Sequence, residues 1–271
     1  MRITTGKLVK TIILLLSFGM SAEYVSFGGE IFSMSGDARI SALGGANPSL
    51  YGSSGQMFSN PALGHIQHND VVTFTYRSQF SGLADFHLFS TPLNFSSNQN
   101  ISLGVIHRSV QDIPYTNNAF EIVGGYPNPI DYDLITMFDH TELAAVFSVA
   151  GNLDKYQMGI NIKTLIYSIY TEKAFGIGLD LGSIWNITPE TILGITLHDI
   201  PVTAIKWSTG QAEWIPVGVS AGVTHTGKKW LITGMFKIDK ILLNNFKILN
   251  RLFLTIRTML TFSDRFQQLL G

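Results

Sequence analysis

The chain of 271 residues contains no cysteine and few charged side chains. The absence of cysteine excludes disulfides, thiolate metal ligands and cysteine nucleophiles together. Charged residues make up 14% of the sequence, whereas a soluble domain usually carries about 25%. After residue 22, no apolar run approaches the roughly 20 residues that a membrane-spanning helix needs. This composition predicts a protein for which water is not the only solvent, and any membrane crossing must then be made by strands.

A concentrated positive charge is also missing. The formal net charge is −1, from 18 basic and 19 acidic residues, and no cluster of Lys and Arg precedes Lys237. Because nucleic-acid binders gather Lys and Arg on one face, the charge pattern argues against that class. Gly44 and Gly45 lack the neighbouring residues and the spacing that phosphate or dinucleotide binding requires, so we expect no cofactor.

The side-chain sets that metal binding or catalysis needs are incomplete. His65 and His68 are three residues apart, but no third metal ligand is close in sequence. A Gly-x-Ser-x-Gly elbow is missing. His198 and Ser220 stand on polar positions of nearby predicted strands, yet the sequence offers them no third partner. We therefore expect no metal site and no enzymatic activity.

The first 22 residues have the three parts of a secretory signal peptide. Basic residues precede an apolar run from 11 to 20, and two small residues, Ser21 and Ala22, follow it. The run is too short for a transmembrane helix. We predict a signal peptide over residues 1–22, and an uncleaved membrane anchor is the alternative.

Between residues 71 and 240 the sequence alternates with a period of two, which is typical of strands. The clearest case is FGIGLDLG, residues 175–182, where large apolar residues alternate with Gly and Asp. The stretches 156–166 and 215–223 repeat the pattern. About nine such segments are separated by turn residues, which predicts an all-β, antiparallel architecture.

Alternation alone does not distinguish a soluble sandwich from a membrane barrel, because the apolar face points inward in one and outward in the other. The polar faces here consist largely of Gly, Ser, Asn and Thr, which suits a filled lumen better than a solvated exterior. Several strands reach about ten residues, the length of a tilted crossing. Six aromatic residues near strand ends suit interfacial girdles. They are Tyr156, Tyr167, Trp185, Trp207, Trp214 and Trp230. We predict a transmembrane β-barrel.

The stretch SGDARISALGGANPSLYGSSGQMFSNPALG, residues 35–64, is rich in glycine and nearly free of charge. It resembles the N-terminal signature of the FadL-like outer-membrane barrels, in particular of the PorV/PorQ family associated with type IX secretion. The matching residues are Ala38, Arg39, Gly44, Gly45, Ala46, Asn60, Pro61 and Ala62. The strands around Gly159 and Asp180 are also similar to paired strands of that family. The acidic turn usual in the family is Gly52-Ser53-Ser54 here, so no role of that turn is carried over.

The resemblance implies a FadL-like barrel of about fourteen strands in the outer membrane of a Gram-negative bacterium. Residues 23–70 would form an N-terminal hatch in the lumen, and residues 71–240 the strands. Backbone outside the barrel wall lies at membrane depth only where protein or a watery cavity surrounds it. Small residues let such a segment pack closely against a narrow lumen, and glycine tolerates its tight turns.

The resemblance also implies a function. By resemblance to the PorV/PorQ family, this protein would receive or hand over secreted proteins at the cell surface, through extracellular loops such as residues 121–139. A FadL-like channel for uptake of hydrophobic small molecules is one alternative, and a soluble periplasmic β-sandwich binding protein is another. The expected partners are outer-membrane lipid, secreted cargo proteins or other secretion components, or hydrophobic small molecules, and not nucleic acid.

Two further expectations concern single regions. Lys163 and Asp180 lie on the lumen faces of consecutive predicted strands, where they would form an ion pair or stay as two hydrated charges. From residue 241 to 271 the alternation disappears, and the sequence predicts irregular or helical structure. This atypical tail suggests truncation or a frameshift of a barrel that would otherwise end in a strand, and a membrane-surface helix is the rival interpretation.

Overall fold

The computed structural model describes most of the chain between residues 29 and 262. The described residues are 29–33, 38–45, 47–52, 55–66, 72–94, 99–119, 122–123, 126–127, 129–153, 156–228, 230–238 and 257–262. The predicted signal peptide, Ala46, His68 and most of the predicted atypical tail lie outside them.

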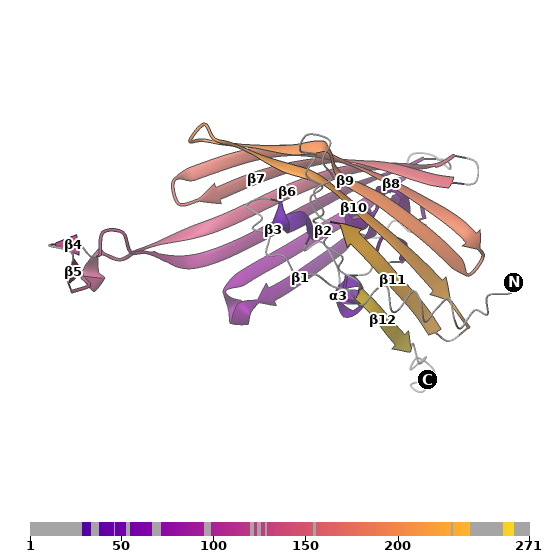
Figure 1. Cartoon of the computed structure of the whole chain (residues 1–271), viewed down its shortest axis with the longest axis horizontal. Coiled ribbons are helices and arrows are strands. Elements are labelled where there is room, and N and C mark those ends of the chain that lie inside the picture. Colours follow the sequence, from indigo (N-terminus) through magenta and orange to yellow (C-terminus); the bar gives the residue numbers. More distant parts are fainter. Residues whose placement is uncertain are drawn as a thin grey trace, which may run out of the picture.

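One curved antiparallel sheet dominates the structure (Figure 1). Its ten strands have the order β1-β2-β3-β6-β7-β8-β9-β10-β11-β12, so neighbours in sequence are neighbours in space apart from the small β4-β5 hairpin. The strands are β1 (Thr73–Gln79), β2 (Ala84–Asn94), β3 (Gln99–Tyr115), β6 (Thr136–Leu153), β7 (Tyr156–Ile169), β8 (Glu172–Thr188), β9 (Thr191–Trp207), β10 (Ala212–Thr226), β11 (Trp230–Ile238) and β12 (Arg257–Phe262). All nine predicted strands are present, which confirms the all-β antiparallel prediction. Within the described part of the chain, β1 and β12 form the two open edges.

Short helices precede the sheet and lie against its concave face (Figure 1). They are α2 (Glu30–Ser33), α3 (Ala38–Ala42), α4 (Gln56–Ser59) and η1 (Pro61–Ile66). The turn between β1 and β2 contains η2 (Phe80–Gly82), and the connection between β3 and β6 contains β4 (Ile122–Val123), β5 (Tyr126–Pro127) and η3 (Tyr132–Leu134). Among the described helices, none is long and apolar enough to cross a bilayer.

The exposed face of the sheet is apolar, and its buried face is small and polar. Along β8, Phe175, Ile177 and Leu179 are exposed, whereas the alternate Gly178 and Asp180 are buried. The same inversion runs along β6 and β7. In a soluble sandwich the apolar face would be the buried one. The sheet therefore has the sidedness of a membrane barrel wall.

The two ends of the sheet differ. At one end, called here the turn end, β8 and β9 are joined by a short turn at residues 189–190. The opposite end, the loop end, carries the connection of residues 116–135, which projects well beyond the other strands (Figure 1). In outer-membrane barrels, short turns face the periplasm and long loops face outward. The turn end would then be periplasmic.

Four of the six predicted girdle aromatics are where a girdle requires them. Tyr156, Trp185 and Trp230 lie near the turn end, and Trp214 is 64% exposed near the loop end. The prediction was wrong for Tyr167 and Trp207, whose rings stack inside the sheet with centroids 5.8 Å apart. Tyr167 has the parity of the inward residues of β7, and a bulge in β9 turns Trp207 inward.

Beyond residue 240, residues 257–262 form a strand where irregular or helical structure was predicted. Arg257–Phe262 form β12, which pairs with β11 from Trp230↔Phe262 to Met235↔Arg257. Irregular or helical structure was expected there because the sequence RTMLTF alternates only weakly. Strand pairing satisfies backbone donors and acceptors at an open edge, and this gain does not require a regular side-chain pattern.

The sidedness of the wall predicts that the same kind of substitution, isoleucine to arginine on the outer face, costs different amounts of stability at two heights. Ile162→Arg places a charge on the outer face in the middle of β7, where we expect a loss of about 2–4 kcal/mol of unfolding free energy in lipid vesicles. Ile187→Arg, on the outer face beside the turn end, should cost about 0–1 kcal/mol. Urea unfolding of both variants in vesicles measures the difference, and equal, small effects would contradict a lipid-facing wall.

Candidate functional site

The inner face of the sheet is built in layers, because inward residues of neighbouring strands pair in register. One layer, called here the apolar belt, runs across six strands through Leu88, Ile106, Ala144, Leu165, Gly176 and Ile205. Apart from Gly176, the five members of this belt are each at most 1% exposed. Nearer the turn end, the layers change to Ser, Asn, Thr and Gly, as at Ser102, Ser148 and Asn161.

The hatch was predicted over residues 23–70, and its described residues, called here the hatch, are 29–33, 38–45, 47–52 and 55–66. Of its predicted motif, Asn60, Pro61 and Ala62 are buried against the wall. Ala38 and Arg39 are exposed in α3, and Arg39 donates a hydrogen bond to the carbonyl of Tyr51 at 2.7 Å. Gly44 and Gly45 follow α3 with φ of 66° and 83°, a left-handed conformation that favours glycine.

Asn60 joins the hatch to the wall. Its side chain is fully buried, and its Nδ2 lies 2.8 Å from the carbonyl oxygen of Pro48 in the hatch. The same nitrogen lies 3.2 Å from the carbonyl of Ser183 in β8 and 3.4 Å from that of Ile195 in β9. Its Oδ1 accepts a hydrogen bond from the backbone N–H of Ala62 at 3.0 Å. One amide thus contacts the hatch and two strands.

Glycines in the wall make room for the hatch backbone. A Cβ built on Gly159 would overlap the carbonyl carbon of Pro61, and one built on Gly194 would overlap the carbonyl oxygen of Pro48. Gly182, opposite Gly159 in the ladder, lies under Asn60 in the same way. Only residues without a side chain allow this approach of backbone to sheet.

Short polar side chains of the wall satisfy hatch carbonyls that have no strand partner. Asn161 donates to the carbonyl of Met57 at 2.9 Å, and Thr196 donates to that of Ser59 at 3.1 Å. These bonds meet the requirement that buried backbone groups be paired. The Gly, Asn and Thr of the inner face are therefore a seat for the hatch.

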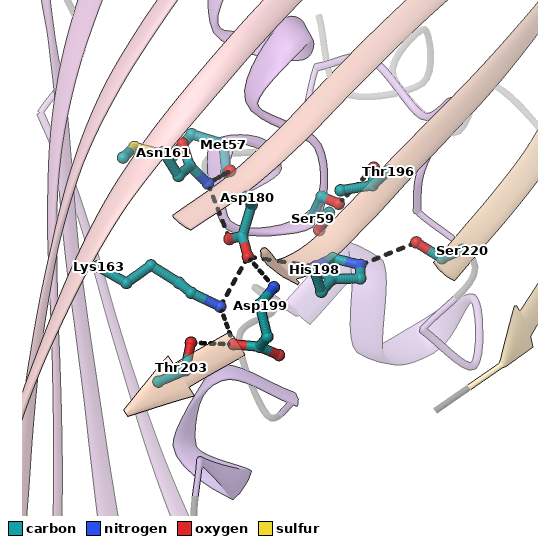
Figure 2. Close-up of polar contacts among 10 residues, drawn as sticks. All are labelled: Met57, Ser59, Asn161, Lys163, Asp180, Thr196, His198, Asp199, Thr203 and Ser220. Carbon is teal, nitrogen blue, oxygen red and sulfur yellow. Dashed lines mark hydrogen bonds and ion pairs between the residues drawn. The ribbon is translucent and has the colours of Figure 1, made fainter. Parts of the chain in front are cut away.

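A charged cluster lies between the seat and the apolar belt (Figure 2). Lys163 Nζ is 2.7 Å from an oxygen of Asp180, so the pair expected from the sequence lies at ion-pair distance. Lys163 is equally close to Asp199, which also accepts a hydrogen bond from Thr203 at 2.6 Å. The backbone N–H of Asp199 donates to Asp180 at 3.0 Å. Lys163 is thus shared by the buried carboxylate of Asp180 and the partly buried carboxylate of Asp199; the side chains of Lys163, Asp180 and Asp199 are 4%, 2% and 17% exposed.

Sequence reasoning missed Asp199 because a bulge places it. The ladder between β8 and β9 shifts between Ile177↔Ala204 and Leu181↔Leu197, so more residues stand on β9 than on β8. Asp199 has a φ of 59° inside this bulge. The available signal was Pro201, because proline in a strand interior often marks a bulge.

His198 and Ser220 also come together. His198 Nε2 lies 2.9 Å from the hydroxyl of Ser220, and its Nδ1 lies 3.9 Å from Asp180 (Figure 2). The sequence placed both on polar positions but offered no third residue. Asp180 is now close, although its carboxylate is already bound by Lys163 and by the backbone of Asp199.

Comparison with known proteins identifies the fold. No family model and no curated protein matches the chain. The solved structures of similar fold include the toluene transporter TodX of Pseudomonas putida, with a TM-score of 0.50, 12% identity and coverage of 79% of this chain and 70% of TodX. They also include the outer-membrane expressed OmpT of Vibrio cholerae, with a TM-score of 0.42, 10% identity and coverage of 61% of this chain. The chain spans about half of the length of OmpT, 49%. The likeness to TodX supports the FadL-like barrel fold, and membership of the PorV/PorQ family stays a prediction.

The close contact between the wall glycines and the hatch backbone predicts that one added side chain displaces the hatch. In Gly159→Leu the new side chain occupies the place of Pro61, so we expect the ion conductance of the protein in planar bilayers to rise. Gly234→Leu is the matched control, because a Cβ at Gly234 meets no described atom within 4 Å. Equal conductance of both variants and the wild type would argue against a hatch held by this contact.

The charged cluster predicts a non-additive effect. Lys163→Met leaves the buried carboxylate of Asp180 and the partly buried one of Asp199 without their cation, and should cost about 3–5 kcal/mol of unfolding free energy. The triple variant Lys163→Met, Asp180→Asn, Asp199→Asn removes all three charges and should regain most of that loss. Exchanging the charges of Lys163 and Asp180 should not restore stability, because Asp at 163 would face Asp199. Urea unfolding in vesicles distinguishes these outcomes. If Lys163→Met left the unfolding free energy unchanged, the cluster would be hydrated.

Proposed function

We propose that this protein is an outer-membrane β-barrel that passes hydrophobic small molecules through a lumen controlled by its hatch. The observation that carries the proposal is the apolar belt. Barrels that conduct water and ions have a polar interior, whereas Leu88, Ile106 and Ile205 point inward here and are buried in one layer. An apolar layer lowers the free energy of a hydrophobic solute relative to water.

The hatch contacts the belt directly. Ile31, Met57 and Phe58 of the hatch belong to the same buried apolar cluster as the belt residues. The backbone N–H of Gly29 donates to the hydroxyl of Tyr167 at 2.6 Å, beside this cluster. Apolar hatch side chains thus occupy the interior that a hydrophobic solute would use, and passage requires that they be displaced.

The comparison supports the same assignment. TodX, with the similar fold, transports toluene. The outward apolar face of the strands supports residence in the outer membrane, with lipid as the surrounding partner. We assign no catalytic step to the His198–Ser220 pair, because Ser220 is 2% exposed and Asp180 is committed to Lys163.

The second candidate is the role implied by the PorV/PorQ resemblance, receiving or handing over secreted proteins. The projecting connection favours it. Residues 111–139 contain five acidic residues, Asp112, Glu121, Asp131, Asp133 and Asp139, and no Lys, Arg or His. Ile130 and Tyr132 in this connection are 53% and 74% exposed. The connection thus offers both carboxylates and exposed apolar side chains to a protein partner.

Polar substitutions in the belt test the first candidate. We expect Leu88→Asn with Ile106→Asn to slow entry of a hydrophobic fluorophore into vesicles that contain the protein, because the apolar layer is interrupted. The matched control is Ser148→Asn, which adds an amide to a layer that is already polar.

A deletion strain separates the two candidates. Loss of growth on a hydrophobic carbon source, restored by the wild-type gene and not by the belt variant, supports uptake. Unimpaired growth, together with co-purification of secreted proteins that depends on residues 116–135, would favour the secretion role instead.

A further inference from the structure

Two lysines stand side by side on the outer face of the wall, near the loop end. Lys206 of β9 is directly opposite Phe175 of β8, and Lys173 lies two residues from Phe175 on the same face. Diagonal neighbours of this kind are about 7–8 Å apart. Both lysine residues are exposed. Two ammonium groups are therefore within reach of one bound molecule.

The acids of this region point to the other face. Glu172, next to Lys173, has inward parity, and its carboxylate accepts hydrogen bonds from Thr171 and Ser208. Glu213 on β10 is also inward and accepts a hydrogen bond from the indole of Trp207 at 2.9 Å. Among the described residues, none forms an ion pair with either lysine. The register thus separates the charges, with cations outside and carboxylates inside.

The surface beside and below the lysines suits acyl chains. Phe175, at the height of Lys206, is 53% exposed, and Trp214, opposite Ala204 and two residues farther from the loop end, is 64% exposed. Tryptophan marks the boundary between hydrocarbon and headgroups, and lysine side chains extend from such a boundary toward the headgroups. An apolar surface with two cations above it matches a lipid whose headgroup carries negative charge.

We propose that Lys173 and Lys206 bind the phosphate groups of lipid A, the phosphorylated glycolipid headgroup of lipopolysaccharide, in the outer leaflet. The inference rests on the proposed outer-membrane location, which places the loop end outside. Two phosphorylated positions on one headgroup fit two neighbouring ammonium groups. On the outward face of β6 at the same end, Asp139 is exposed, and its carboxylate would repel a phosphate group.

The test is a binding titration of the refolded full chain in detergent with diphosphorylated lipid A. Each lysine near a charged lipid surface contributes about a fivefold change, so Lys173→Gln with Lys206→Gln should weaken binding roughly thirtyfold. Lys228→Gln is the matched control, because Lys228 is exposed at the turn end and should leave the affinity unchanged. Dephosphorylated lipid A should bind wild type and double variant equally weakly.

Three results would overturn the proposal. Equal binding of diphosphorylated lipid A to wild type and double variant shows that the lysines do not take part. Full competition by millimolar inorganic phosphate identifies a free-anion site instead of a lipid site. If the double variant has lost its fold, its mobility on a gel no longer changes upon heating. Lys173→Gln and Lys206→Gln are then measured singly, and each should lose about fivefold in affinity. Absence of that loss refutes the site.

The membrane location is tested separately. Release of the wild type from membranes by carbonate would contradict the proposed outer-membrane function itself. A wild type that stays in the membrane but binds lipid A independently of both lysines contradicts only the present inference.

Discussion

The pairing of the hatch backbone is the constraint on which the rest of the structure depends. A segment of short helices and loops cannot satisfy its own carbonyls, and at membrane depth no bulk water replaces the missing partners. Asn60, Asn161 and Thr196 supply those partners from buried positions. The neighbouring glycines make these hydrogen bonds possible, because a side chain at Gly159 or Gly182 would keep the hatch backbone away from its donors.

This requirement divides the interior into two zones. Where the hatch backbone touches the wall, the inward residues are small and polar, and where its side chains Met57 and Phe58 touch the wall, the inward residues form the apolar belt. Lys163 lies between the zones, and its Nζ is also 4.6 Å from the ring centroid of Phe32 in the hatch. The charged cluster thus contacts β7, β8, the bulge of β9 and the hatch.

The alternation of the sequence was enough to predict the strands and their sidedness, since side chains of a strand point to opposite faces whatever the tertiary structure. It was also enough to place Lys163 and Asp180 on one face of neighbouring strands. Prediction failed at Trp207 and missed Asp199, both of which follow from the bulge in β9. A bulge changes the parity of every later residue in its strand, and its position depends on how two strands pair.

An antiparallel sheet with an apolar outer face and a glycine-rich N-terminal segment suited to close packing could be predicted from the amino-acid sequence alone. These properties follow from local rules of periodicity and side-chain size. The folded structure was needed to show which glycine contacts which part of the hatch and which inward residues form the apolar belt. It was also needed to show that Lys206 lies beside Lys173 on the outer face. Such contacts join residues far apart in the chain, and they depend on strand register, which local sequence does not specify.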